Sequence, residues 1–539
     1  MFDTACIIVG IIIGAGIFRA PPLVAASLPS ASLILTAWLA GGLLALLGAL
    51  CYAELTTTYP EPGGDYVYLT RAYGSRAGFL FVWAEFWIIR PGSTGPMAFV
   101  FGEYFKQLLP LGTGHDTLVY AVLAIVGITG LNMLGVRAGK WTQNLLTVVK
   151  VLALVGVFLA AFAVTRPPGA EEHELLEPSA NEHACQLAPP DRFDEFRRDE
   201  RESKEKVYSV IYGHNPETDK WEEQAYRYLQ EDWTEAQARS HCDDHDGIMF
   251  EPATENLAMP PIAAISFAML MVMFCFGGWN DVAFVAGEVR QPERNLLRSL
   301  LLGVGVVTAV YLLVNIAYLH VLGIEGLANT KTPATDMMSL SVGSGGKRLA
   351  SAMICVAALG AINGMIFTGA RVYYAMGRKL SNFGWLAHWN KRMDAPLRSI
   401  GLQSLVILGM VIGFGLMEND FERLVIFTAP CFWLFLLLVG ISLFVLRRRD
   451  ADRKRIFRVP AYPVIPLIFC LGSLFMFYST ARYMIGQLKD PELTSNPAFQ
   501  AILVFTGLAV LAGIVLAIPR QKETVDEDMG GAEYVEPHG

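Results

Sequence analysis

The chain has 539 residues, 53% of them hydrophobic and only 17% charged, and its mean hydropathy is +0.40. This composition excludes a soluble globular protein and is typical of an integral membrane protein. The formal charge of −8 is unevenly placed, because residues 166–258 hold 24 acidic and 10 basic residues, a net of −14, which leaves +6 for the rest of the chain.

Long apolar stretches recur along the chain. A transmembrane helix needs about 20 mostly apolar residues, so the stretches predict an all-α integral membrane protein of about twelve transmembrane helices. In chain order they cover residues 4–26, 31–58, 76–109, 117–135, 141–165, 259–288, 297–323, 346–377, 397–417, 421–447, 459–486 and 498–519.

The same pattern divides the chain into five regions. They are helices 1–5 as a first repeat (1–165), an acidic polar insert (166–258), helices 6–9 (259–417), helices 10–12 (418–519) and a disordered acidic tail (520–539).

Helix 1 is interrupted by glycines. It lacks the basic segment of a secretory signal peptide, and its Gly14 and Gly16 each weaken a helix by roughly 1 kcal/mol relative to alanine. Helix 6 has a similar interruption at Gly277 and Gly278. Non-helical backbone at membrane depth persists only where it is buried in protein or lines a cavity. Close packing of small residues between helices is the alternative explanation.

The two interruptions lie five helices apart, as an inverted repeat of five plus five helices predicts, with a substrate site at the midplane between them. Amides freed at a half-helix N-terminus bind a carboxylate, and freed carbonyl oxygens accept from an ammonium group. A zwitterion therefore suits the site without any charged side chain.

Polar side chains inside the predicted helices are further candidates. Lys150 lies about nine residues into helix 5, a depth of about 14 Å, which makes it a candidate coupling residue; a fixed cation holding helices 1, 5 and 8 together is the alternative. Asn363 is expected to line the cavity, with a hydrogen bond between helices as the alternative. Glu85 and Arg90, five positions apart in helix 3, are expected on somewhat different faces, where pairing with other helices and a role in transport are equally expected.

Lys and Arg gather in alternate loops, most densely from Arg447 to Arg458. Because positive residues near helix ends stay cytoplasmic, both termini are predicted to be cytoplasmic in a plasma or inner membrane, and the insert to lie outside. Near the cytoplasmic ends, Glu54, Glu288 and Arg371 are interpreted as solvated residues rather than as parts of an ion-paired gate.

The insert replaces a short connection between helices 5 and 6. Its first part is rich in Pro, Glu and Asp, which indicates disorder, and from Lys206 the pattern predicts strand, turn, strand, helix and strand. Cys185 and Cys242 lie on the predicted oxidising side, where a disulfide and two free thiols are equally expected. The run 241–246 is interpreted as an acidic helix end rather than a metal site.

Five segments in order resemble the amino acid-polyamine-organocation superfamily, over nearly all of the chain outside the insert. They are GAGIF (14–18), YAELTTTYPEPGGDYVYLTRAYG (52–74), LNMLGVRAGKWTQNLLTVVKVLAL (131–154), FGGWNDVAFVAGEVRQPERNL (276–296) and INGMIFTGARVYYAMGR (362–378). Within the superfamily, FGGWN and Ile89-Arg90-Pro91 are most similar to the L-type exchanger branch and its bacterial relatives.

The resemblance implies the leucine-transporter fold and secondary active transport of amino acids, large neutral or cationic, by exchange or proton symport with alternating access. It places the substrate carboxylate on backbone amides of helix 1, the ammonium group on carbonyls of helices 1 and 6, and an aromatic lid at Phe274. Lys150 would face helix 1. The expected substrate-binding residues are Ile12, Gly14, Ala15, Gly16, Phe274, Phe276, Gly277, Gly278 and Asn363.

The expected partners are an amino acid and the lipid bilayer. Light chains of this branch join a heavy chain through a cysteine between helices 3 and 4, but residues 107–116 contain none, so no disulfide-linked heavy chain is expected. No cofactor, metal or nucleic acid is expected either, and no GxxxxGK[ST] loop occurs. The alternatives are an amino acid sensor whose insert docks a partner and an enzyme carried on the insert, which shows no nucleophile, base and orienter at recognisable spacing.

Overall fold

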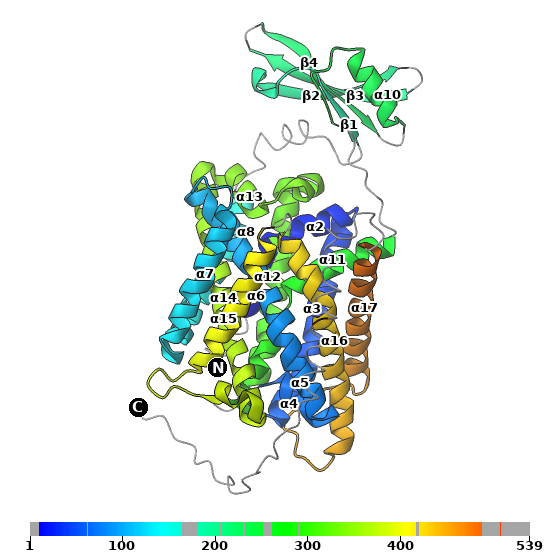
Figure 1. The fold of residues 1–539 in the computed structure, drawn as a ribbon. Coiled ribbons are helices and arrows are strands. Elements are labelled where there is room, and N and C mark those ends of the chain that lie inside the picture. The colour runs from blue at the N-terminus through cyan, green and yellow to red at the C-terminus, as the bar shows by residue number, and fades with distance from the viewer. Residues whose placement is uncertain are drawn as a thin grey trace.

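The structure is a computed structural model that describes residues 10–61, 63–163, 182–203, 206–216, 218–229, 232–251, 261–288, 292–416, 420–487 and 507. A bundle of long helices forms the body of the protein (Figure 1). Its first half contains η1 (Ala15–Phe18), α2 (Ala20–Ser27), α3 (Ala31–Thr58), α4 (Asp65–Tyr73), α5 (Ser75–Ala84), η2 (Glu85–Ile89), α6 (Arg90–Leu108), α7 (Asp116–Met133) and α8 (Val136–Ala163).

The second half of the bundle follows the insert. It contains α11 (Pro261–Cys275), η4 (Trp279–Glu288), α12 (Pro292–Asn329), α13 (Pro333–Val342), α14 (Ser344–Lys379), η5 (Ser381–Ala387), α15 (Leu397–Phe414), α16 (Asp420–Arg449) and α17 (Val464–Gln487).

Helices long and apolar enough to cross a membrane dominate this bundle. Among the described residues there are 8, or up to 9 when the bent pair Gly10–Phe18 and Ala20–Ser27 counts as one span. The predicted stretches 76–109 and 141–165 also form helices, α5 to α6 and α8. The last predicted stretch and the tail lie outside the described residues, apart from residue 507. The expected multi-helix membrane fold is thus confirmed.

Apolar side chains cover the outside of the bundle as well as its interior. Leu302, Leu405 and Leu471 are 54%, 67% and 56% exposed, and such side chains are spread over several helices. A soluble protein rarely exposes apolar surface on this scale, whereas lipid accommodates it. The exposed leucines therefore indicate the faces that contact the bilayer.

Both predicted interruptions are present. Helix 1 leaves helical geometry at Ile13 and Gly14 and continues as η1, and the segment Gly10–Phe18 is bent by 57° from α2. Helix 6 ends as α11 at Cys275 and resumes as η4 at Trp279. Gly278 has φ +93°, and a Cβ there would lie 2.4 Å from the Ile11 side chain. Glycine is therefore required where the two breaks meet.

Equivalent helices of the two repeats pack against each other at the centre of the bundle. Helix α3 packs against α12, and these two are the second helices of the two repeats. Helix α6 packs against α14, and these two belong to the third helix of each repeat. This pairing leaves the broken helices 1 and 6 between the two packed pairs, as an inverted repeat with a central site requires.

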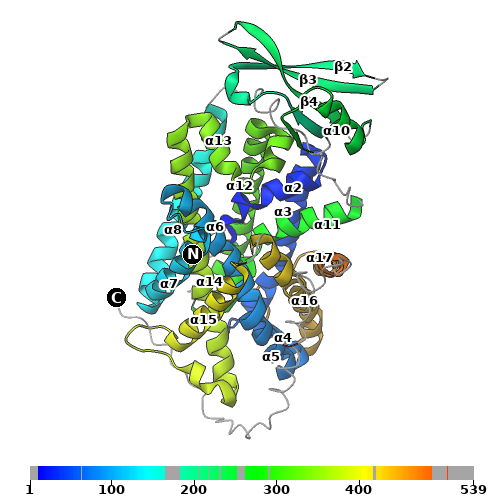
Figure 2. The same ribbon diagram turned by 45° about the horizontal axis from the view of Figure 1, so that its top comes forward.

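The insert forms a small α+β module that lies beyond one end of the bundle (Figures 1 and 2). Its five antiparallel strands are ordered β2-β3-β4-β1-β5. A capping box at Thr234 and Gln237 starts its helix. The elements are β1 (Glu182–Gln186), η3 (Pro190–Arg192), β2 (Glu195–Ser203), β3 (Lys206–Asn215), β4 (Lys220–Leu229), α10 (Glu235–Asp243) and β5 (Met249–Glu251).

The strands and helix predicted from Lys206 onward are present, but the expectation of disorder before it is wrong for residues 182–203. Strand β2 is an edge strand whose side chains are mostly exposed, so its charges are solvated and no apolar alternation marks it in the sequence. Its backbone pairs with β3 along its whole length. A disulfide joins Cys185 of β1 to Cys242 of α10.

The run 241–246 holds no metal-like arrangement. His241 and Cys242 are buried in the module's core, and the Tyr228 hydroxyl lies 2.9 Å from Nδ1 of His241. No group of three or more His, Cys, Asp or Glu residues suited to a metal occurs among the described residues.

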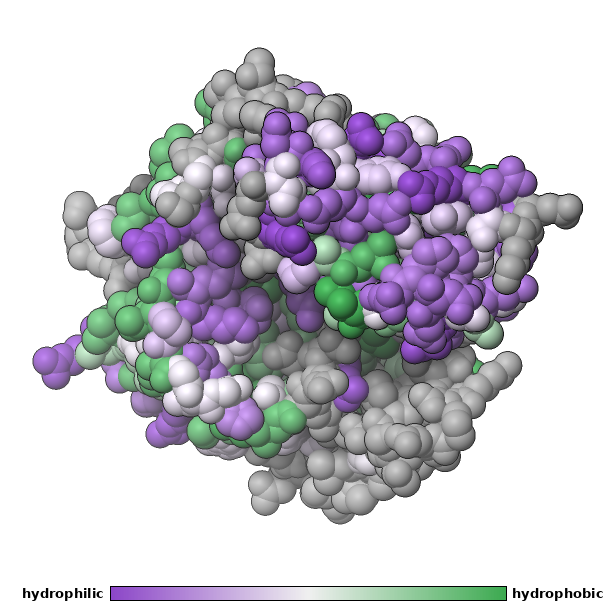
Figure 3. All heavy atoms as spheres, turned by 90° about the horizontal axis from the view of Figure 1, so that it is seen from above, coloured by the Kyte–Doolittle hydropathy of each residue, from purple (hydrophilic) through white to green (hydrophobic). Residues whose placement is uncertain are grey.

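The loops richest in Lys and Arg meet at the end of the bundle opposite the insert. Arg449 donates to the carbonyl of Arg71 at 2.8 Å, and Lys379 lies 3.7 Å from Glu61. The face seen from the insert's end is largely hydrophilic (Figure 3). The loops richest in basic residues therefore lie together at one end of the bundle, away from the insert.

Candidate substrate site

A cavity lies where the two broken helices meet. It holds about 980 Å³ of space between protein atoms, including the part open to solvent. The wall combines backbone of helices 1 and 6 with apolar side chains from α5 to α6 and from α16. Charged and polar side chains line the part of the cavity next to η4, which is called the η4 end below. Its lining residues include Ile12, Gly14, Gly16, Asp65, Phe81, Glu85, Arg90, Met97, Phe274, Gly277, Gly278, Asn280, Asp281, Met365, Thr428 and Trp433.

Most of the expected substrate residues lie on this cavity. Ile12, Gly14 and Gly16 contribute from helix 1, and Phe274, Gly277 and Gly278 contribute from helix 6. Phe274 packs edge-on against Phe421, with ring centroids 5.6 Å apart. An aromatic ring in this position can cover a ligand.

Other expected residues do not line it. Phe276 is fully buried against Trp38 and Tyr311. Asn363 of α14 instead makes 2.8 Å hydrogen bonds with Asn132 of α7 and Gln143 of α8. It therefore joins three helices, which is the alternative role given above. The side chain of Ala15 lies outside the described part of the chain.

Helix 1 presents its backbone to the cavity. Because η1 begins at Ala15, its first amides have no intrahelical acceptor and carry the positive end of a helix dipole. A carboxylate suits this position. The Gly14 amide, which is also expected to hold the carboxylate, instead donates to the Ile12 carbonyl at 2.6 Å.

The carbonyls at the break have protein donors. Lys150, fully buried on α8, donates from Nζ to the carbonyls of Gly10 (2.6 Å) and Ile13 (2.9 Å). The Tyr311 hydroxyl on α12 lies 2.7 Å from Ile12 O and 3.1 Å from Cys275 O. Tyr311 therefore contacts both broken helices. Sequence reasoning missed it, because one tyrosine in an apolar helix carries no distinguishing signal.

We expect Lys150→Met to lower the free energy of unfolding by about 1–3 kcal/mol, because two buried carbonyls lose their donor. The methionine keeps most of the stem that packs near Gly360. Thermal unfolding of the purified protein measures the loss. Uptake across a pH series tests coupling in the same variant: loss of the pH response would assign Lys150 to proton coupling, and an unchanged response would leave it as a fixed cation.

A buried ionic cluster closes the η4 end of the cavity. Arg90 donates to Glu85 from Nε (2.8 Å) and to Asp281 from Nη1 (2.6 Å), and Thr368 donates to Asp281 at 2.8 Å. These side chains of Arg90, Glu85 and Asp281 are 4%, 3% and 8% exposed. The cluster joins η2 and α6 to η4 and α14 at the substrate site.

The expectation that Glu85 and Arg90 face apart is wrong, and the local backbone explains why. Residues Glu85–Ile89 form one π-helical turn, in which the Arg90 amide bonds to the Glu85 carbonyl. The i to i+5 hydrogen bond of a π turn widens the helix by one residue, which brings positions 85 and 90 toward one face. Such turns are frequent at functional sites. Asp281 was missed because its partner is 191 positions away.

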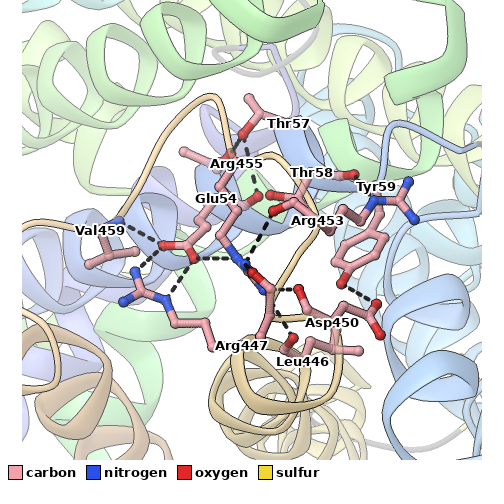
Figure 4. A network of polar contacts seen from close by, with 12 residues as sticks. Glu54, Thr57, Thr58, Tyr59, Leu446, Arg447, Asp450, Arg453, Arg455 and Val459 are labelled. Atoms are coloured by element: carbon pink, nitrogen blue, oxygen red, sulfur yellow. Dashed lines mark hydrogen bonds and ion pairs between the residues drawn. The ribbon is translucent and has the colours of Figure 1, made fainter.

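A second polar network fastens the end of the bundle opposite the insert (Figure 4). Glu54, 1% exposed, accepts from Arg447 Nε and the Val459 amide, both at 2.7 Å, and lies 3.5 Å from Arg455. Glu54 and the buried Arg371 are therefore not solvated as expected, and the Glu288 side chain lies outside the described part. The network ties α3 to α16 and to the loop that follows it.

Tyr59 extends this network. Its hydroxyl donates to Asp450 at 2.6 Å, and burial together with this hydrogen bond raises the pKa of Tyr59 to about 12. Arg453 donates to the Thr58 carbonyl at 3.1 Å. The last turn of α3 is thus held at several points by one loop.

We expect Glu54→Gln to lower the free energy of unfolding by about 1–3 kcal/mol, because the charge-assisted hydrogen bonds to Arg447 and the ion pair with Arg455 are weakened. The matched control is Glu103→Gln, which alters a half-exposed pair with Lys106 and should change stability by less than about 1 kcal/mol. Melting temperatures of the two purified variants check this. Equal melting temperatures would contradict a stabilising role for the network.

The fold and this cavity define a secondary transporter with a substrate site at the midplane of an inverted repeat. The chain belongs to the amino acid permease family, which matches residues 1–509. It is a multi-pass membrane protein that transports amino acids, and not an enzyme. These findings confirm the resemblance and the expected transport of amino acids.

Curated relatives cover most of the chain. The serine/threonine exchanger SteT of Bacillus subtilis is 27% identical over 88% of this chain and 89% of its own length. The b(0,+)-type amino acid transporter 1 of mouse is 26% identical over 95% and 85%. The human cystine/glutamate transporter is 26% identical over 93% and 84%.

Proposed function

We propose that this transporter exchanges one amino acid for another across the membrane, binding each in the cavity between the broken helices. The observation that carries the proposal is the meeting of both backbone breaks at one cavity. The first amides of η1, which precede any intrahelical acceptor, suit the substrate carboxylate, and the names of several relatives describe exchangers or amino acid transporters.

The proposed substrates have large side chains. Phe81, Met97, Phe274 and Trp433 give the cavity an apolar wall, which favours burial of an apolar side chain or a long aliphatic stem. Glycine at 277 and 278 keeps this part of the wall free of side chains.

The proposed arrangement in the membrane places both termini in the cytoplasm and the insert outside. It is supported by the basic loops that meet at the end opposite the insert. A disulfide-linked heavy chain is not part of the proposal, because residues 107–116 contain no cysteine.

Uptake into proteoliposomes tests the function. The panel contains radiolabelled small, large neutral, acidic and cationic amino acids, with and without unlabelled amino acid inside and with an imposed pH gradient. Exchange predicts uptake only into preloaded vesicles. Uptake driven by the gradient alone would replace exchange by proton symport, and saturable binding without uptake in either condition would favour the sensor.

A variant lacking residues 170–255 separates the roles of bundle and insert. Undiminished uptake by this variant is expected, because the lining residues of the cavity all belong to the bundle. Full loss of uptake with normal folding would instead make the external module essential.

A further inference from the structure

The loop between α16 and α17 is strongly basic and lies at the end of the bundle opposite the insert (Figure 1). Residues 447–458 hold seven basic and two acidic residues, a net charge of +5. Four of the arginines bond to Glu54 or to backbone carbonyls of α3 and α4, and three of them are labelled in Figure 4; the four are Arg447, Arg449, Arg453 and Arg455. These four hold the inner side of the loop against the protein.

The other three basic residues point away from the protein. Arg448, Lys454 and Arg458 are exposed, and none of their side chains makes a hydrogen bond or an ion pair with another residue that the structure describes. Ile456, an apolar side chain that is 47% exposed, lies between the last two in the chain. The outer surface of the loop thus combines unpaired positive charge with exposed apolar surface.

Helix α16 places Arg448 in line with a lipid-facing row. Leu434 and Ile441 are exposed apolar residues of this helix, and Arg448 follows Ile441 by the same spacing of seven residues. Seven residues are close to two full turns, so the three side chains share one face, with Arg448 about 10 Å beyond Ile441. An arginine in this place extends its guanidinium from the edge of the hydrocarbon toward the lipid phosphates.

Helix α17 gives the other end of the loop the same position. It begins at Val464, which is 54% exposed, and the exposed residues Leu467 and Leu471 follow on the next two turns. Tyr462, just before the helix, packs against the guanidinium of Arg447, and tyrosine is enriched at membrane interfaces. Both ends of the loop therefore join lipid-facing helices directly, which places the loop in the headgroup layer.

We propose that Arg448, Lys454 and Arg458 bind the phosphates of anionic phospholipid headgroups in the adjoining leaflet. Positive side chains beside a membrane helix attract anionic lipids, and guanidinium groups form paired hydrogen bonds with phosphate oxygens. The occupant is a lipid rather than a soluble anion, because the same surface exposes Ile456 and continues into the lipid-facing sides of α16 and α17. The inference does not depend on which amino acid is transported.

Lipid bound here also stabilises the network on the inner side of the loop. Arg458 precedes Val459, whose amide donates to Glu54. Lys454 precedes Arg455, which lies 3.5 Å from the same carboxylate. Because a headgroup binds the outer side chains only while the loop is folded, its binding raises the stability of the protein.

Thermal unfolding in mixed micelles tests the site. The purified full-length protein, in a neutral detergent, is titrated with phosphatidylglycerol, phosphatidylcholine or inorganic phosphate. The variant is Arg448→Gln/Lys454→Gln/Arg458→Gln. The control removes the same number of charges from exposed residues of the insert, which lies beyond one end of the bundle; it is Arg192→Gln/Lys220→Gln/Arg239→Gln.

Phosphatidylglycerol is expected to raise the melting temperature of the wild-type protein by more than phosphatidylcholine does, and added salt should reduce the difference. The loop variant should need about 10- to 100-fold more phosphatidylglycerol for half of this extra shift, with a wild-type melting temperature in phosphatidylcholine. The insert control should respond as the wild type does. If the loop variant fails to fold, Lys454→Gln/Arg458→Gln leaves α16 unchanged and should show a smaller loss of the same kind.

Four results would overturn the proposal. Equal shifts with the two lipids in the wild type would show that the headgroup charge is not recognised, and a wild-type response in the loop variant would remove these residues from the site. The same loss in the insert control would assign the effect to the net charge of the protein. Equal stabilisation by inorganic phosphate would replace the lipid by a soluble anion.

Discussion

Gly16→Val is expected to abolish amino acid binding. A Cβ at this position would lie 3.0 Å from Sγ of Cys275 and 3.5 Å from the Phe274 ring. The two further methyl groups of valine would occupy the space where the substrate carboxylate meets the η1 amides, and they would force helices 1 and 6 apart. The measurement is radiolabelled leucine and arginine binding to the purified variant, with a loss of at least about 100-fold expected from displaced charge-assisted hydrogen bonds.

The control for this substitution is Gly409→Val in α15, where a Cβ would meet no atom within 4 Å. It adds the same side chain to a membrane helix without touching the cavity. Gly16→Ala should fall between wild type and valine, because its Cβ, 3.0 Å from Sγ of Cys275, requires only a small shift of that side chain and adds no further methyl groups. Wild-type affinity in Gly16→Val, with normal folding, would contradict carboxylate binding by the helix 1 backbone.

The position of the cavity was predictable because it depends on backbone geometry that glycine reveals. Gly14, Gly16, Gly277 and Gly278 stand in otherwise continuous apolar runs, and a break is the local consequence of this pattern. Both breaks are present and both line the cavity. Here a local signal was sufficient, since no distant residue is needed to make a helix open.

The ionic cluster depends on contacts that no local pattern contains. Arg90 meets Asp281 from another helix, and the π turn that aligns it with Glu85 is a small departure from the expected helix. Asn363 was assigned to the cavity because polar residues in membrane helices often line one. Its partners Asn132 and Gln143 lie more than 200 positions away, so the choice between the two roles needs the fold.

Strand β2 shows a different limit. Its sequence, EFRRDERES, has the composition of a disordered segment, and composition governs a prediction when no apolar residue must be buried. The strand forms because its backbone completes the edge of a sheet whose core is built by β3 and β4. Edge strands with charged side chains are common for this reason. Such a segment can be recognised as a strand only after its neighbouring strands are known.

Arg90→Met is expected to lower the free energy of unfolding by about 3–5 kcal/mol, the cost of removing one partner from a buried ionic group. Glu85 and Asp281 would remain as buried carboxylates with no guanidinium between them. Thermal or chemical unfolding of the purified protein measures the loss. The control is Arg76→Met at the exposed start of α5, which should change stability by less than about 0.5 kcal/mol.

A triple variant separates charge from packing in this cluster. Adding Glu85→Gln and Asp281→Asn to Arg90→Met removes the two carboxylates that the single variant leaves unpaired. If uncompensated charge is the cause, the triple variant should recover a large part of the lost stability, because neutral groups cost far less to bury than ions. A triple variant as unstable as the single one would assign the loss to the packing of the Arg90 side chain instead. Recovery would also show that these charges are retained at the substrate cavity for a reason other than stability, since the fold would then persist without them.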